Sequence, residues 1–132
     1  MAVNVLETLA HLHYWSVQMT PSASKDEVLE AFRTSSGIAM INTGDGLVAL
    51  NTVKELMADR GRPHHNLYEV ALWADMLRVQ DDELFYAYMV DNQAIVIPET
   101  IDAIRALTGT VKDSRESIAR TDAALGISHR LF

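Results

Sequence analysis

The first third of the chain alternates between apolar and polar positions in a way that predicts a strand, a helix and a second strand. Apolar or aromatic side chains at every second position favour a strand over residues 11–19. Ser24 and Glu27 have the spacing of a capping box, which predicts a short helix through Phe32. The uninterrupted apolar run 38–41 then predicts a buried strand.

A second helix is predicted to follow the turn at 43–46 and to run to about Arg60. Gly61 suits a C-terminal cap because glycine adopts positive φ without steric cost, and Pro63 prevents continuation of the helix. Apolar side chains recur at helical spacing on its inner face, namely Leu50, Val53, Leu56 and Met57.

The second half of the chain predicts three strands and then two helices. Residues 69–73, 76–79 and 83–90 are strand-like, with a polar turn at 81–82. The next helix has Pro98 in its first turn and is expected to end at Gly109, with an inner stripe of Ile101, Ile104 and Leu107.

The last helix is expected to begin with a reciprocal cap between Asp113 and Glu116 and to end at Gly126. The order β-α-β-α-β-β-β-α-α, with short turns between the later strands, predicts an α+β fold. We expect a mixed, largely antiparallel sheet with the helices packed on one face. A doubly wound nucleotide-binding fold is not expected, because the chain has no glycine-rich turn between a strand and a helix.

Composition narrows the possible classes of function. The 132 residues are 48% hydrophobic and 22% charged, which is typical of one globular domain spanning 1–132. A net charge of −7 argues against a nucleic-acid partner. Zero cysteines exclude disulfides, thiolate metal ligands and a cysteine nucleophile. There is no signal-peptide pattern and no apolar stretch of membrane-spanning length, so we expect a cytoplasmic protein with no membrane partner.

Five segments of this chain follow a pattern known from one enzyme family: Thr8-Leu9-Ala10-His11-Leu12-His13 and residues 61–63, 66–73, 89–106 and 117–126. They resemble the C-terminal part of the catalytic domain of archaeal (type II) phosphorylating glyceraldehyde-3-phosphate dehydrogenase. The first segment is similar to the family's Thr-Leu-Met-His-x-His. The resemblance implies a glyceraldehyde-3-phosphate dehydrogenase-like C-terminal domain without its nucleotide-binding domain.

His11 is the candidate catalytic residue that the resemblance implies. In the family, a histidine at this place is the base that activates the cysteine thiol, and an imidazole suits that role because it titrates near neutral pH. The residue pattern alone favours a strand-end histidine with a backbone partner, and only the resemblance favours the catalytic role.

Asn92 is the candidate cofactor-binding residue. The family has Val-His-Gln-Glu where this chain has Val90-Asp91-Asn92-Gln93, and bacterial relatives have Tyr-Asp-Asn-Glu, whose asparagine holds the nicotinamide carboxamide. An amide can both donate to and accept from a carboxamide. The alternative is that Asp91-Asn92 is only the turn after a strand. Asp91 itself departs from the family pattern.

No metal site is expected. His11 and His13 have the i, i+2 spacing of strand ligands, but a third ligand at a related spacing is lacking. His64 and His65 are expected in a solvent-facing loop. The large aromatic side chains are expected to pack in the core or at an interface, namely Trp15, Trp73, Phe85, Tyr86 and Tyr88.

The resemblance thus predicts one part of an active site. The family oxidises an aldehyde to an acyl phosphate with NAD or NADP, in glycolysis or gluconeogenesis, but the nucleophile and the cofactor domain are lacking here. We expect the isolated chain to be inactive, and to pair with an N-terminal nucleotide-binding half or to self-associate through exposed surfaces. Two alternatives are a non-catalytic oligomerisation or partner-binding module, and a small-ligand or metal-binding protein that uses its histidines.

Overall fold

The fold is built on one five-stranded sheet. A computed structural model describes residues 10–131. The strands follow the order β1-β5-β3-β2, and β4 pairs with β5 outside this path. Their bounds are β1 (His11–Gln18), β2 (Ile38–Ile41), β3 (Val70–Trp73), β4 (Arg78–Gln80) and β5 (Glu83–Val90).

Four helices complete the described chain. They are α1 (Lys25–Thr34), α2 (Leu50–Asp59), α3 (Val96–Thr108) and α4 (Ser114–Leu125). β5 is antiparallel to β1, β3 and β4, whereas β2 is parallel to β3. The predicted α+β class, the mixed and largely antiparallel sheet and the order of the nine elements are confirmed. No helix among residues 10–131 is long and apolar enough to cross a membrane.

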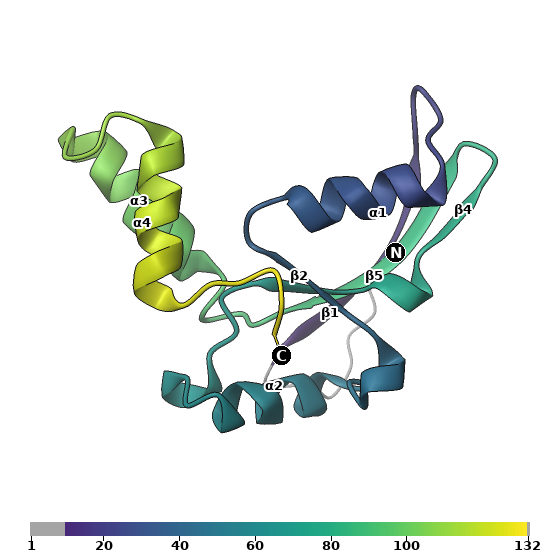
Figure 1. Cartoon of the computed structure of the whole chain (residues 1–132), viewed down its shortest axis with the longest axis horizontal. Helices are drawn as coiled ribbons and strands as arrows, with labels where there is room; N and C mark the ends of the chain where they lie inside the picture. Colours follow the sequence, from purple (N-terminus) through teal and green to yellow (C-terminus); the bar gives the residue numbers. More distant parts are fainter. Residues whose placement is uncertain (1–9, 132) are drawn as a thin grey trace.

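The sequence predicted helices on one face of the sheet, but the structure has helices on both faces. Figure 1 shows α1 and α2 on opposite sides of the strands, and α3 with α4 beyond one end of them. The two hydrophobic clusters agree, because Leu84 of β5 packs with α1 whereas its neighbours Ala87 and Met89 pack with α2. The physical reason is that β3 and β5 carry apolar side chains at consecutive positions, so both faces need cover.

The face that α1 covers, here called the α1 face, is only partly buried. α1 starts with the predicted capping box: the Ser24 hydroxyl accepts from the Glu27 N–H (3.3 Å), and the Glu27 carboxylate accepts from the Ser24 N–H (2.8 Å). Its inner side contributes Val28, Leu29 and Phe32, as predicted. Beyond the reach of α1, the same face carries the first half of β1.

The opposite face, here called the α2 face, holds the larger core. Val53 and Met57 of α2 are fully buried against Ile41 and Trp73, as the helical spacing predicted. The indole N–H of Trp73 donates to the carbonyl of Leu47 (2.6 Å), which ties the entry of α2 to the sheet. Gly61 has φ of 71° directly after the helix, as its capping role requires.

The C-terminal segment is anchored by a buried ion pair. Arg62 forms two bonds with Glu69 (2.6 and 2.7 Å) and donates to the carbonyl of Gly126 (2.6 Å). Glu69 also accepts from the backbone N–H of Ser128 (3.0 Å). This bidentate geometry fixes the end of α4 against the start of β3.

α3 and α4 pack on each other through polar groups. Asp102 of α3 accepts from Ser117 (2.6 Å) and Thr121 (2.7 Å) of α4, and also from Arg105 (3.1 Å). Burial raises the pKa of Asp102, but these hydrogen bonds and the arginine charge outweigh burial and hold the pKa below its ordinary value. Asp113 caps α4 through the Glu116 N–H (2.9 Å). The predicted cap is not reciprocal, because the Glu116 carboxylate bonds Arg120.

The predicted inner stripe of α3 is wrong. Ile104 is 54% exposed and Leu107 is 87% exposed, and Val96 on the same side of the helix is also exposed. The apolar side chains do form a stripe along α3, but polar groups make the contact with α4. No described element covers the stripe.

Candidate functional site

His11 begins β1 and is exposed on the α1 face. It faces Val90 across the antiparallel β1–β5 pair, and the alternation of side chains places His13, Trp15 and Val17 on the same side. The strand predicted over residues 11–19 is confirmed as β1. Thr8 and Leu9, which carry part of the sequence motif around His11, lie outside the described residues.

The structure brings the two candidate site residues into contact. The Asn92 amide nitrogen Nδ2 donates to Nε2 of His11 at 3.1 Å, although 81 residues separate them in sequence. Because Nε2 accepts this bond, the neutral imidazole carries its proton on Nδ1. Both side chains are exposed, so neither is closed inside the core. His11 lies at the start of β1, and among the described residues the partner of its side chain is an amide side chain.

Asp91 fixes the turn that carries Asn92. Its carboxylate accepts from the N–H groups of Leu67 (3.3 Å), Gln93 (3.1 Å) and Ala94 (3.3 Å), and it is paired with Lys54 of α2. Asp91 is buried, which raises its pKa. The Lys54 contact and the three N–H donors outweigh burial and hold the pKa of Asp91 below its ordinary value. The carboxylate is therefore charged, and the turn is held from three directions.

A row of aromatic rings leads along the α1 face to His11. The rings of Tyr86 and Tyr88 have centroids 6.0 Å apart, and Tyr88 stacks on His13 at 4.8 Å with an interplanar angle of 11°. His13 meets His11 edge-on at 6.0 Å. The Trp15 indole donates to the Tyr88 hydroxyl (3.1 Å). These contacts restrict the rotamers of the rings beside His11.

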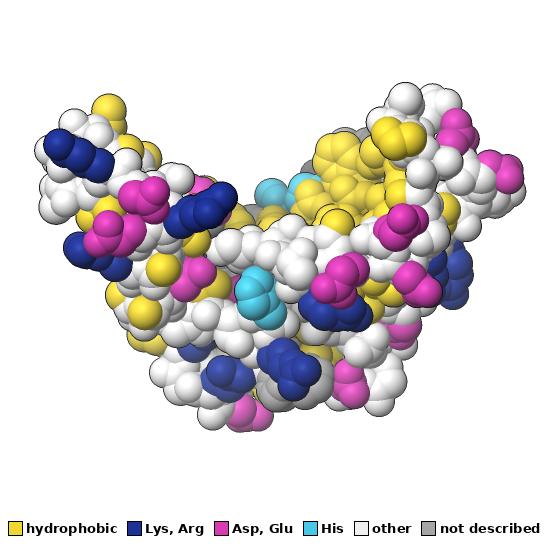
Figure 2. All heavy atoms as spheres, turned by 45° about the horizontal axis from the view of Figure 1, so that its top comes forward, with side chains coloured by type: hydrophobic (Ala, Val, Ile, Leu, Met, Phe, Trp, Pro, Cys, Tyr) yellow, Lys and Arg dark blue, Asp and Glu magenta, His cyan; other side chains and the backbone are white. Residues whose placement is uncertain are grey.

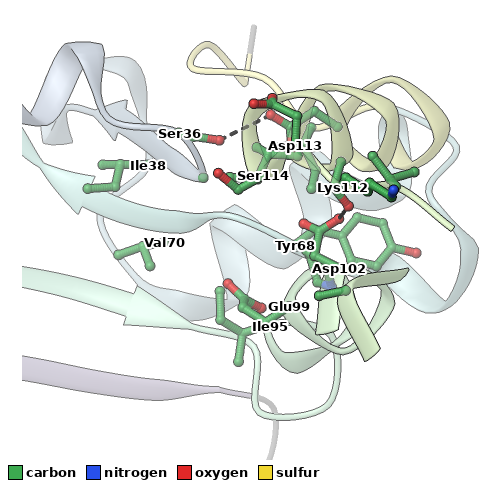
Figure 3. Close-up of a pocket in the computed structure, with 18 of the residues that line it drawn as sticks. Ser36, Ile38, Tyr68, Val70, Ile95, Glu99, Asp102, Lys112, Asp113 and Ser114 are labelled. Atoms are coloured by element: carbon green, nitrogen blue, oxygen red, sulfur yellow. Dashed lines mark hydrogen bonds between the residues drawn. The ribbon is translucent and has the colours of Figure 1, made fainter. Parts of the chain in front are cut away.

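A cavity of about 660 Å³ lies near this site, between the α3–α4 pair and the sheet (Figure 3). Its wall includes Val70 of β3 and Ile38 of β2. Ala71 of β3 faces Met89 of β5, so by the same register Val70 lies opposite Val90, which faces His11 of β1. On its other side, Val70 faces Ile38 of β2. One row across the α1 face therefore runs from His11 to the cavity. Figure 2 shows this face hollowed between the α3–α4 lobe and the α1 lobe.

The other histidines lie apart from one another or on the surface of the described chain. Within residues 10–131, no group of three or more His, Cys, Asp or Glu side chains is placed to hold a metal ion. His64 and His65 are exposed in a short turn with φ of 54° and 57°, so the predicted solvent-facing loop is confirmed.

The aromatic residues divide between the core and the exposed surface. Trp73 is buried in the core, and Tyr86 packs against the cluster under α1. Trp15 is 47% exposed, and Phe85 is also exposed.

Sequence reasoning missed Asp91 and Lys54 as part of the site. The sequence indicated Asp91 as a departure from the family pattern and as part of a possible turn, and it did not single out Lys54. From sequence alone, a lysine in a helix can be recognised as buried and paired only when its acidic partner is known. The Asx-type spacing of Asp91 to Gln93 and Ala94 was a usable signal, because aspartate commonly accepts from the backbone two and three residues on.

Together, the fold and the site define an α+β domain whose open sheet face presents a paired imidazole and amide. No family model matches the chain. Three curated relatives match nearly all of it: glyceraldehyde-3-phosphate dehydrogenases of Methanopyrus kandleri (37% identical, 96% of the chain), Pyrobaculum calidifontis (40%, 95%) and Thermoplasma volcanium (34%, 100%).

The chain spans between 36% and 39% of the length of these three relatives. The resemblance to archaeal glyceraldehyde-3-phosphate dehydrogenases is therefore confirmed: over nearly its whole length, this chain is similar to somewhat more than a third of such an enzyme.

Proposed function

We propose that this chain is the C-terminal catalytic-domain part of an NAD(P)-dependent phosphorylating glyceraldehyde-3-phosphate dehydrogenase and is inactive alone. The observation that carries the proposal is the contact between His11 and Asn92 on an open face of the sheet. The curated relatives support the same activity by their names.

His11 is the proposed base. Its Nε2 carries the lone pair of the ring and accepts from Asn92, so an incoming thiol must displace this amide N–H before Nε2 takes the thiol proton and stands beside the thiolate as imidazolium. The thiolate attacks the aldehyde carbon of the substrate. Because this chain has no cysteine, the thiol must come from another polypeptide segment.

Asn92 is the proposed contact for a nicotinamide carboxamide. Its Nδ2 is directed to His11, which leaves the exposed Oδ1 as an acceptor for an amide N–H. A bound nicotinamide supplies the hydride acceptor that aldehyde oxidation requires. NAD and NADP fit this contact equally, since it does not involve the ribose 2′ position.

The proposed partner approaches over the α1 face. His11, His13 and Trp15 are directed to this side, and Figure 2 shows the hollow above it. The partner is either a nucleotide-binding half that carries the cysteine or, in the alternative below, a second copy of this chain. Glyceraldehyde 3-phosphate is the proposed small-molecule substrate of the assembled site, in the cytoplasm.

Complementation tests this proposal. The N-terminal part of an archaeal relative, which carries the cysteine, is expressed separately and mixed with this chain. We expect NAD(P)-dependent oxidation of glyceraldehyde 3-phosphate only in the mixture, and a loss of about 10³-fold with His11→Asn. Turnover by this chain alone, or full activity of the His11→Asn mixture, would overturn the assignment. Lys25→Gln, on the exposed start of α1, is the control.

A non-catalytic oligomerisation or partner-binding module is the second candidate. The specific observation in its favour is the exposed apolar surface on β1 and α3, where Tyr14 is 70% exposed in addition to Trp15 and Leu107. Light scattering separates the two candidates. A stoichiometric oligomer with no affinity for the N-terminal part favours the module, and a heterodimer favours the enzyme.

A further inference from the structure

The cavity between α3–α4 and the sheet has the size of a small-molecule site. Its volume of about 660 Å³ lies within the range of roughly 300–1,000 Å³ that is common for such sites. Figure 3 shows that its lining comes from the segment before β2, from β3, from the start of α3 and from the start of α4. It is separate from the His11–Asn92 pair, since neither residue lines it.

The cavity has an apolar lining that no described element covers. Ile38, Val70 and Ile95 lie at its sheet side and are each partly exposed, and Ile118 of α4 adds a further partly exposed side chain. Apolar side chains that stay partly hydrated in a concave site gain free energy when an apolar ligand displaces the water.

The polar side chains of the lining carry more negative than positive charge. Asp102 is neutralised by Arg105 and is used in the α3–α4 contact. The other three carboxylates, on Glu99, Asp113 and Asp122, share the lining with only one ammonium group, that of Lys112.

Two of these carboxylates have defined tasks that leave one oxygen over. Asp113 uses Oδ1 to cap α4 through the Glu116 N–H, and Asp122 uses Oδ2 to accept from Ser36 (3.1 Å). Figure 3 shows the Glu99 carboxylate beside Ile95, at the apolar side of the cavity. The electrostatic potential inside the cavity is therefore negative. The apolar walls strengthen it, because their dielectric constant is low.

We infer that this cavity binds an organic cation: an amine with an apolar body. The ammonium group meets the excess carboxylates, and the body covers Ile38, Val70 and Ile95. An anion of the same shape would be repelled by the carboxylates. A neutral analogue would bind more weakly, because it lacks the attraction between the ammonium group and the carboxylates. This inference does not depend on the proposed dehydrogenase function, because it uses neither His11 nor Asn92.

Three ligands of matched shape test the charge preference on the unaltered protein. The probes are 2-phenylethylamine (cation), 2-phenylethanol (neutral) and 3-phenylpropionate (anion), titrated against the methyl NMR signals of the protein at low salt. We expect saturable shifts for the amine at Ile38, Val70, Ile95 and Ile118, and roughly tenfold weaker binding of the alcohol. Equal binding of the three probes, or shifts scattered over the surface, would overturn the inference.

Variants then locate the binding. Glu99→Gln combined with Asp122→Asn should weaken amine binding several-fold, whereas Glu116→Gln, outside the lining, should not. Ala106→Phe should fill the cavity and abolish the shifts. Ala103→Phe is its matched control, because Ala103 is exposed on the same helix but does not line the cavity. Unchanged binding by the Ala106→Phe protein would contradict the location.

Discussion

At the scale of single residues, the candidate site depends on a contact that two separate features produce. The β1–β5 register brings His11 opposite Val90, and the Asp91 turn then directs Asn92 back toward the imidazole. The sequence predicted both members of the pair through their resemblance to family positions. It could not predict the contact, because that depends on a strand register across 81 residues.

The tautomer of His11 is the first testable consequence. In Asn92→Asp, the amide donor is replaced by a carboxylate, which only accepts, so the ring proton should move from Nδ1 to Nε2. ¹⁵N shifts of the His11 ring report the change directly. Gln93→Glu is the control, because Gln93 is exposed one residue away and its side chain is not bonded to His11. The same tautomer in both proteins would show that Asn92 does not donate to His11.

A second consequence concerns the Asp91–Lys54 pair. Removing one partner of a buried ion pair leaves the other charge uncompensated, and typically costs about 3 kcal/mol. Asp91→Asn should therefore lower the free energy of unfolding by about that amount in urea denaturation at neutral pH. Asp26→Asn, on the exposed first turn of α1, should change it by less than about 0.5 kcal/mol.

The same pair predicts the acid limb of stability. A carboxyl group whose folded pKa is depressed stabilises the fold above its unfolded pKa of about 3.9, and the contribution disappears as the pH falls through the folded value. The pKa values of Asp75, Asp91 and Asp102 are all lowered. Stability should therefore decrease steadily below about pH 4, and less steeply in Asp91→Asn. An equally steep limb in that variant would contradict the charged state of Asp91.

At the scale of elements, local sequence signals were sufficient where capping and turn chemistry decide the structure. The Ser24–Glu27 capping box and the glycine after α2 appear as predicted. The sequence did not show which side of the sheet each helix covers, because apolar spacing indicates that a face needs a partner but does not identify the partner. For the same reason the predicted inner side of α3 is wrong: Asp102 makes the contact with α4, whereas the predicted apolar stripe is largely exposed.

The polar contact between α3 and α4 is open to a direct test. Asp102→Ala leaves the Ser117 and Thr121 hydroxyls without their acceptor and should cost about 2 kcal/mol. Hydrogen exchange should increase in α3 and α4 and stay unchanged in β5. Glu116→Ala, which breaks an exposed pair with Arg120, is the control and should cost less than about 1 kcal/mol. Uniform loss of protection across the protein would show that these helices do not form a separable unit.

At the scale of the whole molecule, the described chain leaves apolar surface uncovered in two places. One is β1, on which Tyr14 and Trp15 are exposed on opposite faces of the sheet, and the other is the outer stripe of α3, with Ile104 and Leu107. Patches of this kind favour association. Composition does not show them, because a net charge of −7 and ordinary hydrophobicity describe the chain as a whole and not the distribution over its surface.

Self-association should therefore depend on these patches. Sedimentation at increasing concentration should show oligomers of the unaltered protein, and Tyr14→Lys or Leu107→Lys should raise the dissociation constant about tenfold. Val48→Lys is the control, since Val48 is equally accessible but lies in the loop before α2. If all three variants associate like the unaltered protein, the patches are not the contact surface.

The most direct measurement is the ionisation of the thiol that His11 is proposed to serve. The alkylation rate of the cysteine in the separately expressed N-terminal part is followed with iodoacetamide against pH, with and without this chain. We predict that the chain lowers the apparent pKa of that thiol by more than about one unit, and that the His11→Asn variant binds but leaves it unchanged. An identical thiol pKa with the unaltered chain and with His11→Asn would contradict the account.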